Sequence, residues 1–551
     1  MIFYLFLAVY FVGTAIGMYK LFEKAGLAGW KAFVPVLNLA TLLQLVGRPL
    51  WHLIYLLIPV VNLFYWAYVM IETANSFGKY TFLDHFYAGV LPFWFFPKIG
   101  FNTEDRYLGG DFATHEAFTA ELKAAGTDMA VSGKVLRKYS QYEKGTVRDW
   151  AETIVFAVFA ASFIRMFCFE MYVIPTPSME GSLLVGDYLA VSKLSYGLRT
   201  PKTILSLPLL HNVIPYLGIE SYSDASQFDY HRFKIPFLSG DVARYDPVVF
   251  NFPAGDIVAL PLPTAELKSP KYNQDMFFGE GHRTDYDSYQ RMLGADPSIQ
   301  QVGVDKFIHD NFKVFTRPVD KRDFFIKRCV GLPGDKIEVK DRALYVNGAP
   351  ATVPEMLQFS YTVVTKEALN EDGLLALGID FNRSQEQPNL YQMFLHQSQV
   401  DALKKWKEIE KIEARNDPAG KVSRDVFPQD TVNFKFNMDN YGPIVLPKKG
   451  EVLQLNANNI AYYRRLITAY EGNTLKVEGN SISINGKPTT TYTCQMDYYW
   501  MMGDNRHNSE DSRVWGYVPE DHIAGKPLFI WFHKGKNGID FSRFFTGAKR
   551  L

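Results

Sequence analysis

The stretch FFIKRCVGLPGDKIEVKDRALYVNGAP (Phe324–Pro350) is built from short apolar and β-branched runs separated by Gly, Pro, Asn and Asp. This pattern predicts a strand followed by a hairpin, and Asn347-Gly348 predicts the tight turn of that hairpin. Leu475–Pro488 repeats the hairpin pattern without a gap, which indicates two instances of one hairpin and not a duplicated domain. Runs of the same kind at Asp241–Pro253 and Gly525–Phe532 predict further strands. The chain from Met171 to about His533 is therefore predicted to be mostly β.

One part of this region has a different pattern. Gln399–Arg415 is highly charged and has helical spacing. It predicts a solvated helix within an inserted subdomain.

The start of the chain has the composition of a membrane protein. Its first 97 residues contain only eight Asp, Glu, Lys or Arg residues. Ile2–Met18 is an uncharged apolar run without the basic start of a cleaved leader, so it predicts a retained anchor. Trp51–Ile71, with 21 residues and no formal charge, predicts a spanning helix. Phe33–Val46 and Phe86–Phe96 are shorter and contain or adjoin prolines, which leaves re-entrant, interfacial and tilted arrangements open.

A further crossing is predicted just before the β region. Lys134–Arg148 has five basic residues against one acidic residue, so the positive-inside rule places it in the cytoplasm. Thr153–Cys168 is apolar except for Arg165, whose side chain can extend to the far interface. Everything after Glu170 is then expected outside the cytoplasm.

Composition and motifs exclude several classes of protein. The 58 Lys and Arg residues balance 58 Asp and Glu residues, so no bulk attraction to nucleic acid is expected. His115-Glu116 lacks the second histidine of a zinc-binding helix, and no phosphate-binding glycine loop follows a strand, so we expect no metal and no cofactor. Cys168, Cys329 and Cys494 are far apart and are interpreted as buried thiols, with a bridge between the last two as the open alternative.

Two residues in different segments are candidates for chemistry. Ser178 follows the predicted anchor by about ten residues, and Pro175 and Pro177 stiffen the backbone around it. Strand alternation places Lys327 on an apolar face with Phe325, where lost hydration is expected to lower the lysine pKa. A general base near neutrality needs a pKa of about 7 to 8 instead of about 10.4, which corresponds to roughly 4 kcal/mol. Taken alone, a serine in a proline-rich loop is usually structural, and an isolated lysine usually extends from a strand edge.

The third segment, GDNRHNSEDSRVWGYVPEDHIAG (Gly503–Gly525), places acidic and basic residues around Ser509. Asp504, Arg506, Asp511 and Arg513 are close enough in sequence to pair and to hold a hydroxyl in one direction.

These three segments, in this order, resemble the bacterial type I signal peptidase family, which consists of membrane-anchored Ser/Lys proteases that remove signal peptides from exported proteins. The resemblance is carried by I-P-x-x-S-M with L-x-x-G-D, by F-I-K-R-x-V-G-L-P-G-D, and by G-D-N-R-x-N-S-x-D-S-R-x-W-G-x-V-P, with Asp246–Pro253 as a weaker box. GWKAFVPVLN (Gly29–Asn38) is similar to a multi-span module at the start of some bacterial members. The chain departs from the family in having Thr176 and Pro177 before the serine, and in two long insertions between the boxes.

The resemblance implies a role for each matching residue. Ser178 would be the nucleophile and Lys327 the neutral general base, while the Ser178 N–H and the Thr176 hydroxyl would form the oxyanion hole. Ser509 would orient the lysine, and Asp511 and Arg513 would brace its loop. The pockets for small substrate side chains would be lined by four residues: Met179, Leu183, Phe325 and Ile326.

The resemblance also implies an organisation and partners. The expected segments are a multi-span membrane module (1–97), a cytoplasmic loop (98–148), a transmembrane anchor (149–170), the first part of a catalytic β domain (171–350, with an insertion at 254–322), an inserted subdomain (351–474), the second part of the catalytic domain (475–535) and a tail (536–551). The expected partners are signal peptides of exported preproteins, the lipid bilayer and, by proximity, the secretion translocon, but not nucleic acid. The chain would be a multi-pass protein of the bacterial cytoplasmic (inner) membrane, with its catalytic domain on the periplasmic side.

Two other interpretations stay open at this point. A Ser/His/Asp hydrolase could use His507 or His522 with Asp511 or Asp504. A membrane scaffold whose β domain binds partners and has lost catalysis is the non-enzymatic alternative.

Overall fold

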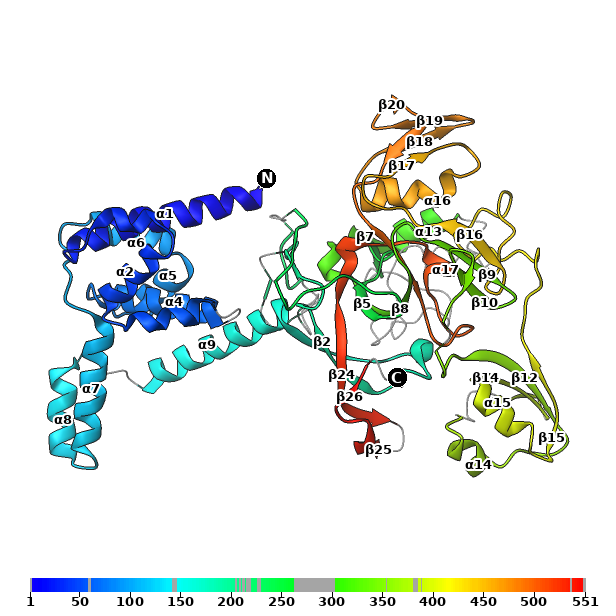
Figure 1. The fold of residues 1–551 in the computed structure, drawn as a ribbon, viewed down its shortest axis with the longest axis horizontal. Helices are drawn as coiled ribbons and strands as arrows, with labels where there is room; N and C mark the ends of the chain where they lie inside the picture. Colours follow the sequence, from blue (N-terminus) through cyan, green and yellow to red (C-terminus); the bar gives the residue numbers. More distant parts are fainter. Residues whose placement is uncertain are drawn as a thin grey trace. The chain divides into compact units, whose positions relative to one another are not determined.

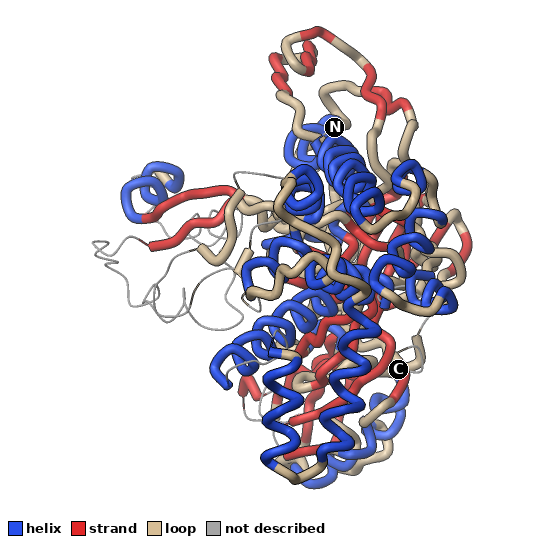
Figure 2. The backbone as a smooth tube through the Cα atoms, turned by 90° about the vertical axis from the view of Figure 1, so that its left-hand side faces the viewer, coloured by secondary structure: helices blue, strands red, loops and turns tan. Residues whose placement is uncertain are grey.

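The computed structural model describes residues 2–548 except 58–60, 141–145, several positions between 204 and 228, 262–302, 353, 380–384, 388 and 536–537. The chain forms two compact units, Met1–Ala161 and Ser162–Leu551, which are considered separately. Helices make up the first unit, and strands predominate in the second (Figures 1 and 2).

The first unit is a set of packed helices: α1 (Ile2–Lys24), α2 (Leu37–Val46), α3 (Leu53–Leu57), α4 (Val61–Asn75), α5 (Phe82–Val90), α6 (Pro92–Phe101), α7 (Asp111–Ala125) and α8 (Met129–Lys138). Glycines allow α1 and α6 to approach closely, because a Cβ atom added at Gly17 would lie 2.5 Å from the Cβ of Phe96. Figure 1 shows α7 and α8 side by side.

The structure bears on two of the predicted membrane spans. Within the part of the chain that the structure describes, one helix is long and apolar enough to cross a membrane, Asp149–Phe167. It lies in α9 (Thr146–Phe167), where the anchor was expected. The described residues of the uncharged run Trp51–Ile71 lie in the 3-10 turn Leu50–His52 and in α3 and α4, and residues 58–60 between these helices lie outside the described residues.

The centre of the second unit is an antiparallel sheet in the order β1-β2-β24-β5-β8-β22-β23. Its strands are β1 (Phe169–Val173), β2 (Asp187–Ser192), β24 (Ile523–Gly535), β5 (Pro247–Asn251), β8 (Phe324–Gly331), β22 (Tyr498–Met502) and β23 (Val518–Pro519), with β25 (Gly538–Ile539) and β26 (Thr546–Gly547) beside β24. β8 is a central strand that pairs with β5 on one side and β22 on the other. Every residue of β5 and the last five residues of β8 are buried, so this part of the sheet is covered on both faces.

Both predicted hairpins are confirmed. The first comprises β9 (Lys336–Lys340), β10 (Ala343–Val346) and β11 (Ala349–Pro350), and the second comprises β18 (Leu475–Glu478), β19 (Ser481–Ile484) and β20 (Lys487–Pro488). Asn347 and Gly348 have φ of 55° and 82°, and Asn485 and Gly486 have φ of 51° and 77°. Two consecutive residues with positive φ are what a type I′ turn requires.

A separate sheet follows the first hairpin, in the order β13-β14-β12-β15. Its elements are β12 (Phe359–Thr365), α14 (Glu371–Ala376), β13 (Gln385–Gln387), β14 (Leu390–Leu395), α15 (Gln397–Leu403) and β15 (Ile409–Ala414), and they enclose a core of their own. The prediction of one helix over Gln399–Arg415 is wrong, because α15 ends at Leu403 and β15 pairs with β12. Ile409 and Ile412 of this segment pack against the core of the small sheet, and this packing outweighs the local helical spacing.

The remaining elements link these sheets: β3 (Leu198–Arg199), β4 (Arg232–Phe233), β6 (Ile257–Pro261), α13 (Val304–Asn311), β7 (Phe312–Thr316), β16 (Tyr441–Val445), β17 (Val452–Gln454), α16 (Ile460–Arg465), β21 (Thr491–Thr493) and α17 (Ser512–Trp515). β16 pairs with β9, so the chain returns to the first hairpin after the small sheet. β6 pairs with β7, and most of the insertion expected at 254–322 lies between them, outside the described residues.

All three cysteines are buried free thiols, as the sequence indicated. Cys329 and Cys494 do not form a disulfide.

Candidate active site

Ser178 and Lys327 meet in the interior of the second unit. Lys327 Nζ donates a hydrogen bond to Ser178 Oγ across 2.7 Å. Ser178 lies in the 3-10 turn Pro177–Met179 after β1, and Lys327 lies opposite Val248 in the middle of the sheet. The two residues are 8% and 3% exposed, so the contact is largely shielded from bulk water.

An aromatic ring lies beside the amine. Lys327 Nζ lies 5.6 Å from the centre of the Phe325 ring and donates to the Ile326 carbonyl oxygen at 3.0 Å. Phe325 in turn stacks on Phe252, with ring centres 4.5 Å apart, and meets Trp515 edge-on. The apolar face predicted for Lys327 is therefore present.

A second hydroxyl lies beside the serine. Thr176 Oγ1 is 3.4 Å from Ser178 Oγ, so the threonine that departs from the family pattern still places an oxygen next to Ser178.

The loop from Gly503 to Arg513 packs directly on the serine turn. The Asn505 N–H donates to the Ser178 carbonyl oxygen at 3.1 Å. A Cβ atom at Gly503 would lie 2.5 Å from that same oxygen and 2.2 Å from Ser509 Oγ, so only glycine fits here without displacing a neighbour. Ser509 is buried, and its hydroxyl donates to the Glu510 carbonyl oxygen at 3.4 Å. The predicted hydrogen bond from Ser509 to Lys327 stays a prediction.

Asp511 and Arg513 form a buried ion pair that shapes this loop. Arg513 Nη2 and Nε donate to the two carboxylate oxygens of Asp511 at 2.7 Å and 2.9 Å. Burial raises the pKa of Asp511, but the charge and hydrogen bonds of Arg513 outweigh burial and hold that pKa below its ordinary value. The Gly503 N–H also donates to Asp511, so the ion pair fixes the backbone that contacts Ser178.

A second buried ion pair was not predicted from the sequence. Arg328 follows Lys327 in β8 and donates from Nε and Nη2 to both carboxylate oxygens of Asp504, at 2.8 Å and 2.6 Å. Ser182 donates to the same carboxylate at 2.6 Å. This cluster joins the strand of the lysine, the loop of the serine and the Gly503–Arg513 loop. Its signal in the sequence is an arginine on a strand whose other residues are almost all apolar.

The residues expected to line the substrate pockets fall into two core clusters. Met179, Leu183 and Ile326 pack in one cluster, and both Met179 and Leu183 are only 1% exposed. Phe325 packs in the other cluster, beside Cys329 and Trp515.

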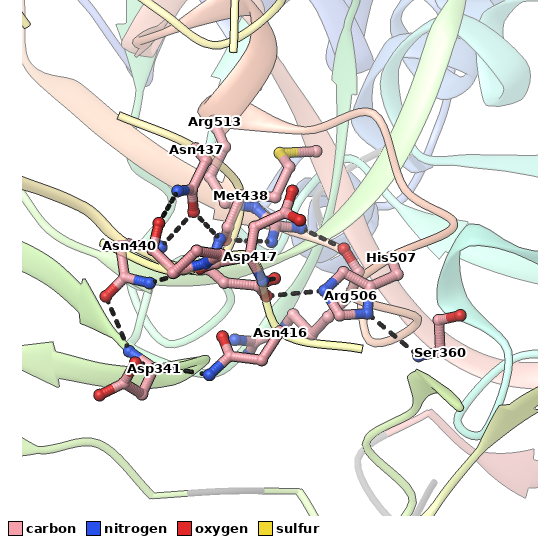
Figure 3. Close-up of polar contacts among 12 residues, drawn as sticks. Asp341, Ser360, Asn416, Asp417, Asn437, Met438, Asn440, Arg506, His507 and Arg513 are labelled. Carbon is pink, nitrogen blue, oxygen red and sulfur yellow. Dashed lines mark hydrogen bonds and ion pairs between the residues drawn. The ribbon is translucent and has the colours of Figure 1, made fainter. Parts of the chain in front are cut away.

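The two histidines considered for a catalytic triad are engaged elsewhere. His507 accepts from the Ser360 N–H (Figure 3). Its other ring nitrogen contacts Asp439, so both ring nitrogens are occupied. His522 is held by Asp521 at 2.6 Å and by Arg322 at 2.8 Å. Burial lowers the pKa of His522 to about 4, against the opposing effect of Asp521. Neither ring is placed to accept a proton from Ser178.

Within the described residues, no three or more His, Cys, Asp or Glu side chains are grouped so that they could hold a metal ion.

Comparison with known proteins identifies the family of the chain. A family described as signal peptidase, peptidase S26, matches residues 147–402 and 489–532, which is more than half of the chain. Residues 30–110 match a family of unknown function, DUF5684.

Individual relatives show the same likeness. Signal peptidase I from Haemophilus influenzae is 23% identical over 438 residues, covering 76% of this chain and 81% of the relative. Signal peptidase I from Buchnera aphidicola subsp. Schizaphis graminum is 22% identical over 384 residues, covering 69% and 73%. Signal peptidase I from Leptolyngbya laminosa is 35% identical over 114 residues, which is 18% of this chain and 56% of the relative. With the family match across both halves of its β unit, the chain belongs to the signal peptidase family, peptidase S26.

Proposed function

We propose that this chain removes signal peptides from exported preproteins by means of a Ser178–Lys327 dyad. Membership of the signal peptidase family supports the reaction, and the 2.7 Å contact between the amine and the hydroxyl supports the two residues. The contact lies where an ammonium ion loses hydration, which favours the neutral amine that a general base requires.

The reaction follows from this contact. Lys327 Nζ takes the proton of Ser178 Oγ while that oxygen attacks the scissile carbonyl carbon. The resulting oxyanion is held by the Ser178 N–H and the Thr176 hydroxyl. The lysine ammonium then gives its proton to the leaving amine nitrogen, and an ester between Ser178 and the signal peptide remains. Water attacks the ester with Lys327 again as the base, which releases the signal peptide and restores the serine.

The surrounding residues support the dyad. Ser509 orients the lysine, while Asp511 and Arg513 hold the loop that carries Ser509. Met179, Leu183, Phe325 and Ile326 line the pockets that select small side chains in the substrate.

The anchor keeps the proposed active site close to the membrane. Ser178 follows the end of α9 by only a short strand and turn, so it is confined near the membrane into which the apolar part of the substrate inserts. Shared confinement raises the local concentration of enzyme and substrate. We place the β unit on the extracytoplasmic side of the bacterial cytoplasmic membrane, close to the secretion translocon, because Lys134–Arg148 is basic.

In our proposal the N-terminal region also crosses the membrane, in addition to the anchor. The helix α1 has 23 residues and an uncharged apolar start, so it is a second crossing, and the chain is multi-pass. The functional division is that proposed from the sequence, with the membrane module at 1–97, the loop at 98–148, the anchor at 149–170 and the catalytic parts at 171–350 and 475–535 around the inserted subdomain.

Cleavage of a preprotein in detergent tests this function. Ser178→Ala is expected to abolish cleavage, because it removes the hydroxyl that Lys327 Nζ contacts. His522→Asn is expected to cleave at a rate within about threefold of wild type, because its ring is bonded to Asp521 and Arg322. Cleavage by Ser178→Ala, or its loss in a folded His522→Asn variant, would contradict the dyad.

A further inference from the structure

His507 joins the Gly503–Arg513 loop to two other segments of the chain. Its Nδ1 accepts the Ser360 N–H at 3.0 Å, and its Nε2 lies 2.7 Å from Asp439 Oδ1. A backbone N–H can only donate, so Nδ1 carries no proton and Nε2 donates to the carboxylate. The side chains of His507 and Asp439 are 5% and 3% exposed, which makes this a buried contact.

Asp439 is itself fixed by its neighbours, of which Asp417 and Asn437 are labelled in Figure 3. Its second carboxylate oxygen accepts the Asp417 N–H at 2.8 Å, and its own N–H donates to Asn437 Oδ1 at 2.9 Å. Its carbonyl oxygen accepts the Arg342 N–H at 2.9 Å, which ties it to the turn between β9 and β10. His507 therefore donates to an acceptor that is held from three directions.

The Ser360 side of the contact is also tied to the active site. Gln358 pairs with Asn505, since its N–H donates to the Asp504 carbonyl oxygen and its carbonyl oxygen accepts the Arg506 N–H, both at 2.9 Å. Two residues earlier, the Met356 carbonyl oxygen lies against Gly181 in the serine loop, only 2.1 Å from where a Cβ atom would stand. The segment Met356–Ser360, which leads into the small sheet, thus lies against both loops of the candidate active site.

His507 lies between two residues of the Gly503–Arg513 loop that bear on the active site. Asn505, two residues before it, holds the Ser178 carbonyl oxygen, and Ser509 lies two residues after it. We infer that His507 is a positioning residue for the peptidase reaction: it holds the Gly503–Arg513 loop against the Ser178 turn by binding Asp439 and Ser360. The long segment between the two hairpins therefore braces the active site. This inference rests on the proposed function.

The test uses the full chain in detergent, with kcat and KM measured separately on a preprotein. His507→Ala is expected to lower kcat by about 10- to 100-fold with KM within about twofold of wild type, because small displacements near reacting atoms slow the chemical step more than they weaken binding. His507→Gln is expected to restore kcat to within about fivefold, since its amide offers an NH₂ group that donates and a carbonyl oxygen that accepts. Asp439→Asn should resemble His507→Ala, because an amide NH₂ group would face either the His507 ring N–H or the Asp417 N–H.

His533→Ala is the matched control. His533 makes an equally short buried contact of 2.7 Å, with Asp187. Arg543 also holds that carboxylate, so the hydrogen bond that it accepts from the Leu184 N–H is expected to persist when His533 is removed. His533→Ala is expected to lower the melting temperature about as much as His507→Ala does, without lowering kcat. If His507→Ala kept the wild-type kcat while Ser178→Ala was inactive, the positioning role would be overturned but the proposed function would not. Equal losses of kcat in His507→Ala and His533→Ala would also overturn the positioning role, whereas full activity of Ser178→Ala would overturn the proposed function itself.

Discussion

Gly503 is the residue at which one added methyl group would disturb the site most directly. A Cβ atom there would stand 2.2 Å from Ser509 Oγ and 2.5 Å from the Ser178 carbonyl oxygen, and neither neighbour is the free end of a flexible side chain. We expect Gly503→Ala to reduce kcat at least tenfold, on the order of what an ångström of displacement costs, and to lower the free energy of unfolding by about 1–3 kcal/mol, as overpacking does. Cleavage kinetics and urea unfolding measure the two effects. Unchanged kcat would show that the loop can move away from Ser178 without consequence.

Single residues also show how far the sequence could predict the site. Strand alternation predicted Lys327 beside Phe325, and the lysine amine does lie near that ring, because alternation is a local property of β8. The meeting of Lys327 with Ser178 depends on strand pairing across the sheet, so only the family resemblance indicated it. The Arg328–Asp504 pair was missed because an arginine on an apolar strand signals only one partner, and the other lies 176 residues away in the sequence.

Among the elements, the junction of the anchor with β1 has a pH-dependent stability. Glu170 is buried there and accepts from Arg165 Nε at 2.7 Å, while Lys193 Nζ lies 2.7 Å away. Burial raises the pKa of Glu170, but the charge of Lys193 and the hydrogen bonds to the carboxylate outweigh burial and lower the pKa to about 2. A carboxyl group whose pKa is lowered by folding stabilises the fold above its unfolded pKa of about 4.3, and this contribution is lost as the pH falls toward 2.

Glu170→Gln is therefore expected to destabilise the chain near pH 7 and to differ less from wild type near pH 3. The full shift corresponds to about 3 kcal/mol, and the buried Lys193, whose pKa is lowered by burial, offsets part of it. Unfolding midpoints in detergent at the two pH values measure the difference. A gap between the two proteins that widened in acid would contradict the pairing.

The elements also differ in how well the sequence predicted them. Both Asn-Gly hairpins were predicted because a two-residue turn with positive φ has a local signature. Gln399–Arg415 was predicted wrongly because a short charged segment fits helical spacing by chance, whereas its pairing with β12 depends on residues outside it.

At the scale of the whole molecule, the sequence indicated an apolar helix followed by a mostly β unit, and the structure has both in that order. The Asp439–His507 contact could not be predicted, because it depends on the return of the chain from the small sheet to β9. The proposed active site contains residues from three segments that the central sheet brings together. Its catalysis therefore depends on the folded β unit as a whole.

The measurement that tests this claim most directly is kcat/KM of Lys327→Ala on a preprotein, with the full chain in detergent. If the amine that contacts Ser178 is the base, kcat/KM falls by at least about 10³-fold while the variant stays folded. A folded Lys327→Ala chain that kept more than about a tenth of the wild-type kcat/KM would show that another group activates the serine.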